Sequence, residues 1–305
     1  MAAAVRIRRY QPADFESIAQ LAVDASAQPE TACGQPDVAS VAEFQTDYGH
    51  RALESEAWVG ESADGQVVAF AAGTTRRGVV LIDGPIVASG WRGQGLGRSL
   101  FERISDEAAE QGVEWLEVGV RSTNQRGDDF LETLGCETCR EVFVYESHQP
   151  ARGEFLVPEG YSLADLKPRS LLPFLMVMHE CFPGYRLPST PQRLFEPDRM
   201  KIMLVLDPAD QVAGAVTAFF YPEDGHGYLY HLGISEPHRG KGLARALLAH
   251  ASNWLWEAHQ PHLIGLSTSD DLTLRQKLFH PLGFALQYSL RYRRRRTRQP
   301  APQGE

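Results

Sequence analysis

Alternating and amphipathic runs of apolar residues occur in the same order twice along this chain of 305 residues. The first series predicts strands at 57–59, 67–73 and 79–87, a helix from about 95, a strand at 115–120, a helix at 126–134 and a strand at 141–145. The second series predicts strands at 201–206, 212–220 and 227–234, a helix from about 242, a strand at 263–267, a helix at 274–278 and a strand at 285–292. Strands that alternate with helices in this way predict a mixed α/β sheet with helices on both faces.

The two series are copies of one domain. Residues 87–100 recur as 234–247 at a constant offset of 147 positions, and Leu134-Gly135 recurs as Leu282-Gly283. An ordered set of such matches indicates a duplication. Between the copies, glutamine, proline, glycine and charged residues replace the periodic pattern, which marks a linker. We therefore expect an N-terminal domain at 1–147, a linker at 148–158, a C-terminal domain at 159–296 and a tail at 297–305.

Composition limits what these domains can do. Lys and Arg number 30 against 39 Asp and Glu, and the net charge of −9 argues against a nucleic-acid partner. The sequence has neither a membrane-spanning apolar stretch nor the apolar core of a signal peptide, so we expect no membrane partner. Four cysteines are too few for a disulfide framework, which favours the reducing cytoplasm. Cys136 and Cys139 form a C-x-x-C pair without a second ligand pair, so we expect no metal site.

The most informative repeated segment is a glycine-rich turn between a hydrophobic strand and a helix. It reads Arg92-Gly93-Gln94-Gly95-Leu96-Gly97 in the first copy and Arg239-Gly240-Lys241-Gly242-Leu243-Ala244 in the second. Glycines let a ligand approach the backbone closely, and free amides at a helix N-terminus bind a phosphate or diphosphate. The spacing fits neither the dinucleotide-binding motif nor the Walker motif. It fits the pattern Arg/Gln-x-x-Gly-x-Gly/Ala, on which the chain resembles the GNAT superfamily of acetyl-CoA-dependent N-acetyltransferases. The resemblance implies two tandem GNAT-like domains, each a mixed, splayed central sheet flanked by helices.

The resemblance also implies a set of cofactor contacts in each copy. The CoA diphosphate would be held by the backbone of Arg92, Gly93, Gln94, Gly95, Leu96, Gly97 and Arg98, and of Arg239, Gly240, Lys241, Gly242, Leu243 and Ala244. The strand ends Ile86, Val87 and Ala88, and Leu232, Gly233 and Ile234, would pair with the pantetheine arm and polarise the thioester carbonyl. Gly84-Pro85 and Gly233 stand where the family bulges this strand.

The second family motif is kept less well. Asn124 occupies its asparagine position in the first copy. Leu131 and Phe279 stand where the family has the tyrosine that protonates the departing thiolate. This difference from the family pattern puts the protonation of the thiolate in doubt in both copies, although a thiolate whose thiol has a pKa of about 8.5 is itself a good leaving group.

Attack by an amine on the thioester needs a base near the end of the central strand. Deprotonating a lysine-like amine of pKa about 10.4 at neutral pH costs roughly 4.6 kcal/mol, which a positioned base must offset. The candidates are Asp83 and Glu61 in the first copy, and Glu223, Tyr230 and His231 in the second. A histidine suits the role because its pKa lies near neutrality. His231 fits equally well a polar residue packed under a helix, and Glu223 fits a hairpin loop.

These features leave competing functional hypotheses. We favour an N-acetyltransferase that moves the acetyl group of acetyl-CoA to a primary amine of a small molecule or peptide, by direct attack in a ternary complex. The first copy has the better cofactor motif and the second has more titratable groups, so we expect the first to bind CoA structurally and the second to carry the chemistry. The tandem layout is similar to that of mycothiol synthases. The alternatives are a CoA- or acyl-CoA-binding protein with one or both halves inactive, and an interaction protein that uses its basic end.

Two properties follow less directly from the sequence. Six arginines between 291 and 298 predict a strand end that runs into a solvated tail. Tandem copies can pair with each other within one chain, so the sequence allows either a monomer or a homodimer.

Overall fold

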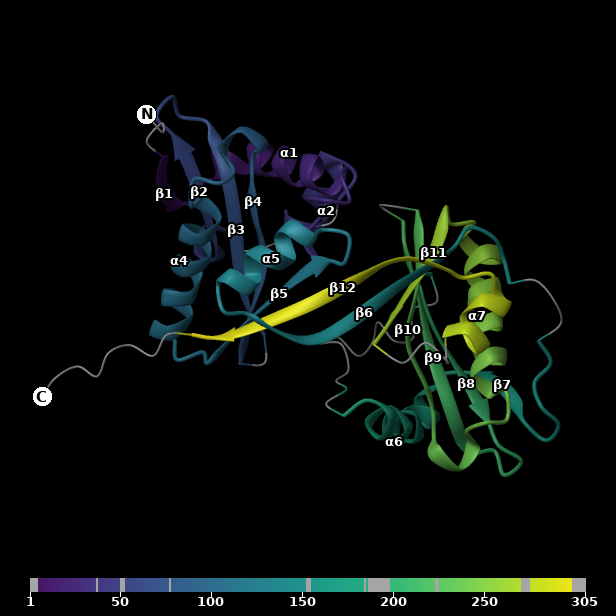
Figure 1. Cartoon of the computed structure of the whole chain (residues 1–305). Helices are drawn as coiled ribbons and strands as arrows, with labels where there is room; N and C mark the ends of the chain where they lie inside the picture. The colour runs from purple at the N-terminus through teal and green to yellow at the C-terminus, as the bar shows by residue number, and fades with distance from the viewer. Residues whose placement is uncertain are drawn as a thin grey trace, which may run out of the picture. The chain divides into compact units, whose positions relative to one another are not determined.

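The computed structural model describes residues 5–36, 38–49, 53–76, 78–151, 155–183, 185, 198–222, 225–269 and 275–297. The chain divides into two compact units, one made of Met1–Val142 with Tyr288–Glu305 and the other of Phe143–Gln287. Each unit is a mixed sheet flanked by helices, which confirms the predicted fold class (Figure 1). None of the helices in the described part of the chain combines the length and the apolar character that crossing a bilayer requires.

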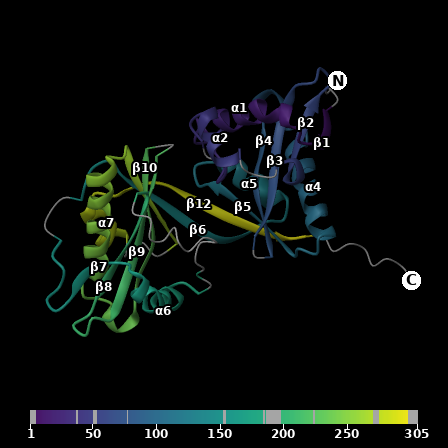
Figure 2. The ribbon, with the colours of Figure 1, turned by 180° about the vertical axis from the view of Figure 1, so that it is seen from behind.

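The N-terminal unit is built on a sheet with the strand order β1-β2-β3-β4-β5-β12. Its elements are β1 (Val5–Arg9), α1 (Phe15–Ser26), α2 (Val41–Tyr48), α3 (Leu53–Glu56), β2 (Ala57–Ser62), β3 (Val67–Arg76), β4 (Val79–Val87), α4 (Leu96–Glu110), β5 (Trp115–Arg121), α5 (Gln125–Thr133), the start of β6 (Glu137–Ser147) and most of β12 (Ala285–Arg296). Neighbouring strands of this sheet are antiparallel except for β4 and β5. Helices α1 and α2 cover one face, around Phe44 and Phe70, and α4 covers the other, around Leu100 and Leu116 (Figure 2).

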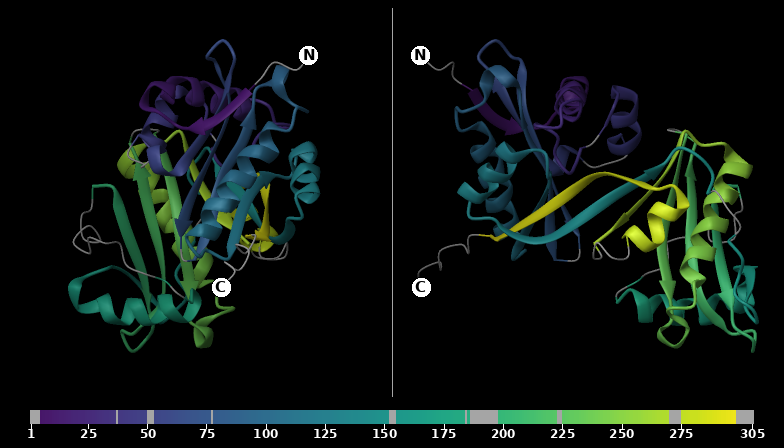
Figure 3. Two further views of the ribbon diagram at one scale, coloured as in Figure 1. Left: turned by 90° about the vertical axis from the view of Figure 1, so that its left-hand side faces the viewer. Right: turned by 45° about the vertical axis from the view of Figure 1, so that its right-hand side comes forward.

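The C-terminal unit repeats this plan with the strand order β6-β11-β10-β9-β8-β7. Its further elements are β7 (Ser162–Asp165), α6 (Leu171–Cys181), β8 (Met200–Leu206), β9 (Val212–Tyr221), β10 (His226–Ile234), α7 (Leu243–His259), β11 (Leu263–Thr268) and a short π-helical turn at Arg275–Phe279. Strands β10 and β11 are the parallel pair. Helix α6 covers one face, around Phe174 and Leu204, and α7 covers the other, around Leu247 and Ile264 (Figure 3).

The last strand of each copy joins the sheet of the other copy. The end of β6 pairs with β11, from Phe143 opposite Thr268 to Ser147 opposite Ile264. Strand β12 pairs with β5, from Leu290 opposite Arg121 to Arg296 opposite Trp115. The expected ranges 1–147 and 159–296 kept each last strand with its own copy, and the compact units differ from them at this point. The two copies present equivalent sheet edges, so a reciprocal exchange satisfies the same backbone donors and acceptors.

The arginine-rich end forms part of strand β12, which runs four residues beyond the predicted strand 285–292 and ends at Arg296, immediately before the expected tail of 297–305. Alternation along the strand sends Arg293 and Arg295 to the same face of the sheet. There Asp128 accepts hydrogen bonds from Nε and Nη2 of Arg293 at 2.6 and 2.9 Å, and Glu102 accepts two from Arg295 at 2.9 Å each. Sequence reasoning missed these ion pairs because each arginine lies more than 160 positions from its carboxylate.

The described part of the predicted linker packs on the C-terminal unit. The amide of Ala151 donates to Oδ1 of Asn253 at 3.0 Å, and Phe155 and Val157 pack against the core beneath α7. Of the C-x-x-C pair, Cys136 is buried in the core of the N-terminal unit, and this burial raises its pKa to about 11. Within the described ranges, no group of three or more His, Cys, Asp or Glu side chains is placed to hold a metal ion.

Candidate functional site

The parallel pair of strands in each unit separates partway along its length. Strand β4 stays paired with β5 from Val79 to Ile82, and the last pair joins Ile82 to Val118. In the C-terminal unit the corresponding ladder ends at Leu229 opposite Leu266. Because β4 and β10 continue for five more residues, a gap opens beside the end of each central strand.

A bulge in the central strand begins where the strands separate. On β4, two residues, Gly84 and Pro85, stand opposite the single residue between Phe70 and Ala72, as the sequence predicts. On β10, His231 and Leu232 stand opposite the single residue between Ala215 and Thr217, so this bulge lies immediately before the predicted Gly233. Gly84 has a φ of +88° and His231 a φ of +49°. The left-handed conformation costs a residue with a Cβ about 1–2 kcal/mol, so His231 holds backbone strain that Gly84 avoids.

The glycine-rich turns have the same geometry in both units. Gly93 and Gly95 have φ values of +76° and +83°, and Gly240 and Gly242 have +77° and +84°. No described atom lies within 4 Å of the position that a Cβ would take on any of these four glycines. The turns therefore keep an open face at the start of α4 and of α7, where a ligand can reach the backbone.

The turn of the N-terminal unit presents unpaired backbone donors. The first amides of an α-helix have no acceptor within the helix, and α4 begins at Leu96. Among the described residues, no backbone carbonyl accepts from the amides of residues 93–98. These donors and the positive end of the helix dipole suit an anion. Arg92 lies beside them, with its Nε donating to the carbonyl of Val87 at 2.8 Å, and Arg239 makes the matching contact with Ile234 at 3.0 Å.

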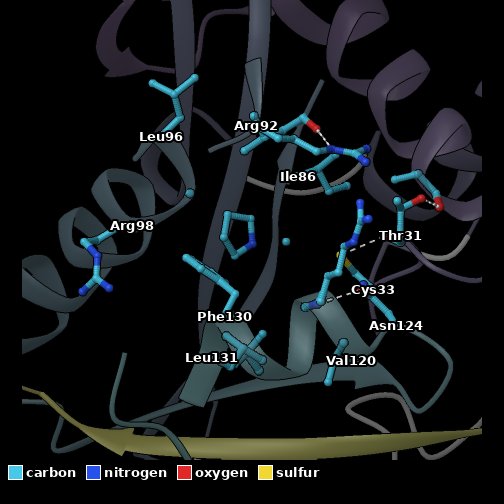
Figure 4. Close-up of a pocket in the computed structure, with 18 of the residues that line it drawn as sticks. Thr31, Cys33, Ile86, Arg92, Leu96, Arg98, Val120, Asn124, Phe130 and Leu131 are labelled. Atoms are coloured by element: carbon cyan, nitrogen blue, oxygen red, sulfur yellow. Dashed lines mark hydrogen bonds between the residues drawn. The ribbon is translucent and has the colours of Figure 1, made fainter. Parts of the chain in front are cut away.

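A cavity of about 480 Å³ joins this turn to the gap between β4 and β5. The predicted cofactor residues that line it are Ile86, Val87, Arg92, Gly93, Gly95, Leu96, Gly97, Arg98 and Asn124, whereas Ala88 and Gln94 are outside its lining. Figure 4 shows Leu96 and Arg98 at one side of the cavity and Thr31, Cys33 and Asn124 at the other. Three arginines and one glutamate line the cavity, so its charge favours a polyanionic ligand.

The segment between α1 and α2 forms the wall of the cavity opposite the turn. Asn124 holds this segment, because its Nδ2 donates to the carbonyl of Ala32 at 3.1 Å while its Oδ1 accepts from the amide of Gly127 at 2.8 Å. Thr123 donates to the carbonyl of Pro29 at 2.9 Å. Sequence reasoning assigned Asn124 to the cofactor, and the structure adds that its carboxamide positions the wall.

The candidate bases of the N-terminal unit differ in placement. Asp83 is buried at the level where β4 and β5 separate, and its Oδ2 accepts a hydrogen bond from the hydroxyl of Tyr48 at 3.1 Å. Glu61 is instead paired with Arg8 at 2.9 Å, and this hydrogen bond lowers the pKa of Glu61. Leu131, which replaces the tyrosine of the family motif, lines the cavity. Asp83 thus belongs to the strand that borders the gap, but it is not among the residues that line the cavity.

In the C-terminal unit, side chains at the end of α6 pack against the end of the central strand. The sulfur of Cys181 and the ring of Phe182 lie at 3.0 and 3.1 Å from the position of a Cβ on Gly233. The thiol of Cys181 also donates to the carbonyl of Ile234 at 3.4 Å. These groups cover the face of the sheet at Gly233, as the cluster beneath α1 covers Ile86 in the first copy.

His231 and Tyr230 belong to an aromatic cluster at this strand end. The rings of Tyr185 and Phe182 lie with their centroids 5.0 and 5.6 Å from the centroid of the His231 ring, both edge-on. Desolvation by this cluster lowers the pKa of His231, which keeps the imidazole neutral at pH 7. Burial and the hydroxyl of Tyr221 at 2.6 Å raise the pKa of Tyr230, so its phenol stays protonated.

Further predicted residues of the C-terminal unit have partners within the protein. Phe279 is buried in the core, with its ring centroid 5.0 Å from that of Tyr145. Lys241 donates to the hydroxyl of Tyr161 at 2.8 Å. Glu223 lies outside the described residues.

Sequence reasoning missed several residues of the cavity. Glu30, Thr31 and Cys33 come from the segment between the first two helices, and Phe130 comes from α5. The residues between the first two helices could not be chosen from the sequence, since that segment has no periodic pattern.

Comparisons with known proteins agree with this geometry. The model of the acetyltransferase (GNAT) family matches residues 15–136 and 172–284, one match in each copy. A crystal structure of a GCN5-related N-acetyltransferase from Sphaerobacter thermophilus is 22% identical, with 96% of each chain covered and a TM-score of 0.81. A tandem GNAT protein from the clavulanic acid biosynthesis pathway is 15% identical, with 98% of this chain and 100% of that chain covered and a TM-score of 0.69. At these identities the two structures show a shared fold. No curated protein matches the sequence.

Proposed function

The chain belongs to the acetyltransferase (GNAT) family through both of its copies, and from this premise we propose that it is an acetyl-CoA-dependent N-acetyltransferase whose N-terminal unit binds the acetyl donor. The acceptor is a primary amine of a small molecule or peptide. The observation that carries the proposal is a continuous cavity that runs from the glycine-rich turn into the gap between β4 and β5. A nucleotide bound at the turn can place its acyl arm in that gap.

The residues of the cavity fit the chemistry of this donor. The amides of residues 93–98 and the guanidinium groups of Arg92, Arg98 and Arg126 suit phosphate groups. The amide of Ala88 donates to Val68 on β3, so strand alternation turns the backbone of Val87 toward the gap, where it can pair with an amide of the arm. Pro85 faces the same way but has no N–H, which leaves Val87 as the backbone donor of this strand end.

The proposed transfer joins the amine nitrogen to the acetyl carbon, breaks the bond between that carbon and sulfur, and releases CoA as a thiolate that takes a proton from water. The amine must lose a proton, and Asp83 is the proposed final acceptor; because its buried carboxylate does not line the cavity, the proton reaches it through water. The hydroxyl of Tyr48 positions this carboxylate. The cavity has Leu131 at the usual place of the acid, so the thiolate leaves without help from that position. Thiol acidity makes this feasible.

The C-terminal unit is proposed to be the half without donor chemistry, which reverses the division favoured by the sequence. The cavity that joins the glycine-rich turn to the gap of the N-terminal unit supports this assignment. The strained backbone of His231 favours a second candidate, in which this unit also catalyses transfer, because strained residues cluster at active sites.

A matched pair of glycine variants tests which unit binds the donor. Gly95→Asp and Gly242→Asp alter equivalent turns with φ values of +83° and +84° and equally open surroundings. Each variant costs about 1–2 kcal/mol of backbone strain and adds a negative charge beside a bound diphosphate. Gly95→Ala and Gly242→Ala carry the strain without the charge and serve as controls.

Isothermal titration with acetyl-CoA measures the outcome. We expect Gly95→Asp to abolish binding, Gly95→Ala to weaken it, and Gly242→Asp to leave it unchanged. Turnover against a panel of primary amines should follow the same order. If Gly242→Asp abolishes turnover while Gly95→Asp preserves it, the assignment to the N-terminal unit is wrong. If the native chain binds no acetyl-CoA, the proposed function as a whole is wrong.

A further inference from the structure

Resting on the proposed function, we propose that the segment of residues 29–35, here called the wall segment, restricts the donor to short acyl groups, with Cys33 as the residue that contacts the acyl end. The wall segment connects α1 to the region before α2 and closes the cavity opposite the glycine-rich turn. The inference concerns donor specificity, which the family likeness does not supply.

The wall segment lies between the two separated strands. The amide of Gly84 on β4 donates to the carbonyl of Gln35 at 2.9 Å, and the amide of Gly34 donates to the carbonyl of Gly119 on β5 at 2.8 Å. Cys33 forms a single antiparallel bridge with Val120. The wall segment therefore bonds to both strands just beyond the point where they cease to bond to each other.

The contact between the wall segment and β5 leaves no room for a carbon chain. A Cβ on Gly34 would lie 2.8 Å from the Cα and carbonyl carbon of Gly119. Non-bonded carbons need about 3.5–4.0 Å, so an alkyl chain cannot pass between these two backbones. The gap is thus filled by peptide at the level of Gly84 and Gly119.

The length of β4 places an acyl group against this barrier. An arm held by the turn runs back along β4 from Val87, and the three residues to Gly84 span about 10 Å of strand. Cys33, Gly84 and Gly119 all line the cavity, and the hydrogen bonds of the wall segment to β4 and β5 close the gap at this level. An acetyl group ends in front of Cys33, and each further methylene must displace the wall segment.

The wall segment is held firmly enough to resist that displacement. Asn124 and Thr123 each bind one of its carbonyls, as described above, in addition to the bonds to both strands. Moving the wall segment would therefore break hydrogen bonds at Pro29, Ala32 and Gln35 together. A pocket that excludes a single methylene typically discriminates by about 10- to 200-fold.

The test measures binding of CoA, acetyl-CoA, propionyl-CoA and butyryl-CoA to the full chain by isothermal titration. For the native protein we expect acetyl-CoA to bind at least about tenfold tighter than butyryl-CoA. Cys33→Ala shortens the contact residue and should reduce this ratio several-fold. Cys33→Leu should weaken acetyl-CoA about tenfold and leave free CoA unaffected, because CoA has no acyl group to meet the leucine. Cys139→Ala is the matched control: Cys139 is a half-buried thiol of the same unit whose sulfur donates to the carbonyl of Tyr292, and it does not line the cavity.

Each result has a defined meaning. Equal affinity of the native protein for acetyl-CoA and butyryl-CoA would overturn the inference and leave the donor site intact. Equal weakening of CoA and acetyl-CoA in Cys33→Leu would show that Cys33 does not lie at the acyl end, which also overturns it. Failure of the native chain to bind any of the four compounds would refute the proposed function itself. The inference is supported if the ratio of the affinities for acetyl-CoA and butyryl-CoA falls in Cys33→Ala but not in Cys139→Ala.

Discussion

Asp128 anchors the exchanged strand β12 in the N-terminal unit, so its replacement by alanine tests the strand exchange. Asp128 is 4% exposed and accepts hydrogen bonds from Arg293 at 2.6 and 2.9 Å, with a further contact to Arg291. Arg293 is 9% exposed and its other bond goes to the carbonyl of Cys136 at 3.0 Å. Asp128→Ala therefore leaves a buried guanidinium without its carboxylate.

The magnitude follows from burial. Removing one partner of a buried ion pair costs about 3–5 kcal/mol, because the remaining charge stays desolvated. Arg296, on the same strand, pairs with Glu114, and these two side chains are 70% and 59% exposed. An ion pair of this kind contributes about 0–1 kcal/mol. Glu114→Ala is thus the matched control. The double variant Asp128→Ala/Arg293→Met should recover most of the loss, because it removes both charges.

The effect should also depend on pH with a defined sign. The hydrogen bond from Arg293 lowers the pKa of Asp128 below that of the unfolded chain. The ion pair therefore stabilises the protein at pH values above the unfolded pKa, about 3.9, and its contribution is lost as the pH falls further. The difference between the native protein and Asp128→Ala should be full at pH 7 and shrink below about pH 4.

Urea denaturation followed by circular dichroism gives the free energy, and hydrogen exchange of the β5 and β12 peptides shows where protection is lost. We expect faster exchange in both strands, because the register joins them from Leu290 to Arg296. A loss below about 1 kcal/mol, equal to that of Glu114→Ala, would refute the reasoning. Unchanged exchange in β12 at pH 7 would do the same.

Three further predictions concern other parts of the chain. Truncation after Gln287 removes only residues of the second copy, yet limited proteolysis should then cleave β5, which loses its neighbour β12; continued protection of β5 would contradict the strand exchange. His231→Gly should be more stable than His231→Ala by about 1 kcal/mol in thermal denaturation, because only glycine relieves the φ of +49°, and equal stabilities would show that the strain is absent. Gly34→Ala should lower the free energy of unfolding by about 1–3 kcal/mol, since its Cβ would meet the backbone of Gly119 at 2.8 Å. Gly90→Ala places its Cβ in open space and should be near neutral, so equal melting temperatures for the two variants would argue against the close contact.

Much of the fold followed from local patterns in the sequence. The strand–turn–helix segments around Gly95 and Gly242 were located from spacing alone, because glycine is the residue that adopts positive φ without strain. The parted central strands and the bulge at Gly84-Pro85 were expected from the family resemblance, and the register confirms both. Asp83 was chosen for its position on the strand, and its bond to Tyr48 became visible only in the structure.

The sequence by itself determined the duplicated domain, the two glycine-rich turns and the family, because these depend on residues close together along the chain. The tertiary structure alone decided which sheet each last strand joins, since both copies carry the same strand pattern and either pairing satisfies the backbone. It also decided the role of the arginines in β12, whose carboxylate partners are remote in sequence. The wall of the cavity was decided in the same way, because Cys33 and Gly34 meet β5 through contacts between segments more than 80 positions apart.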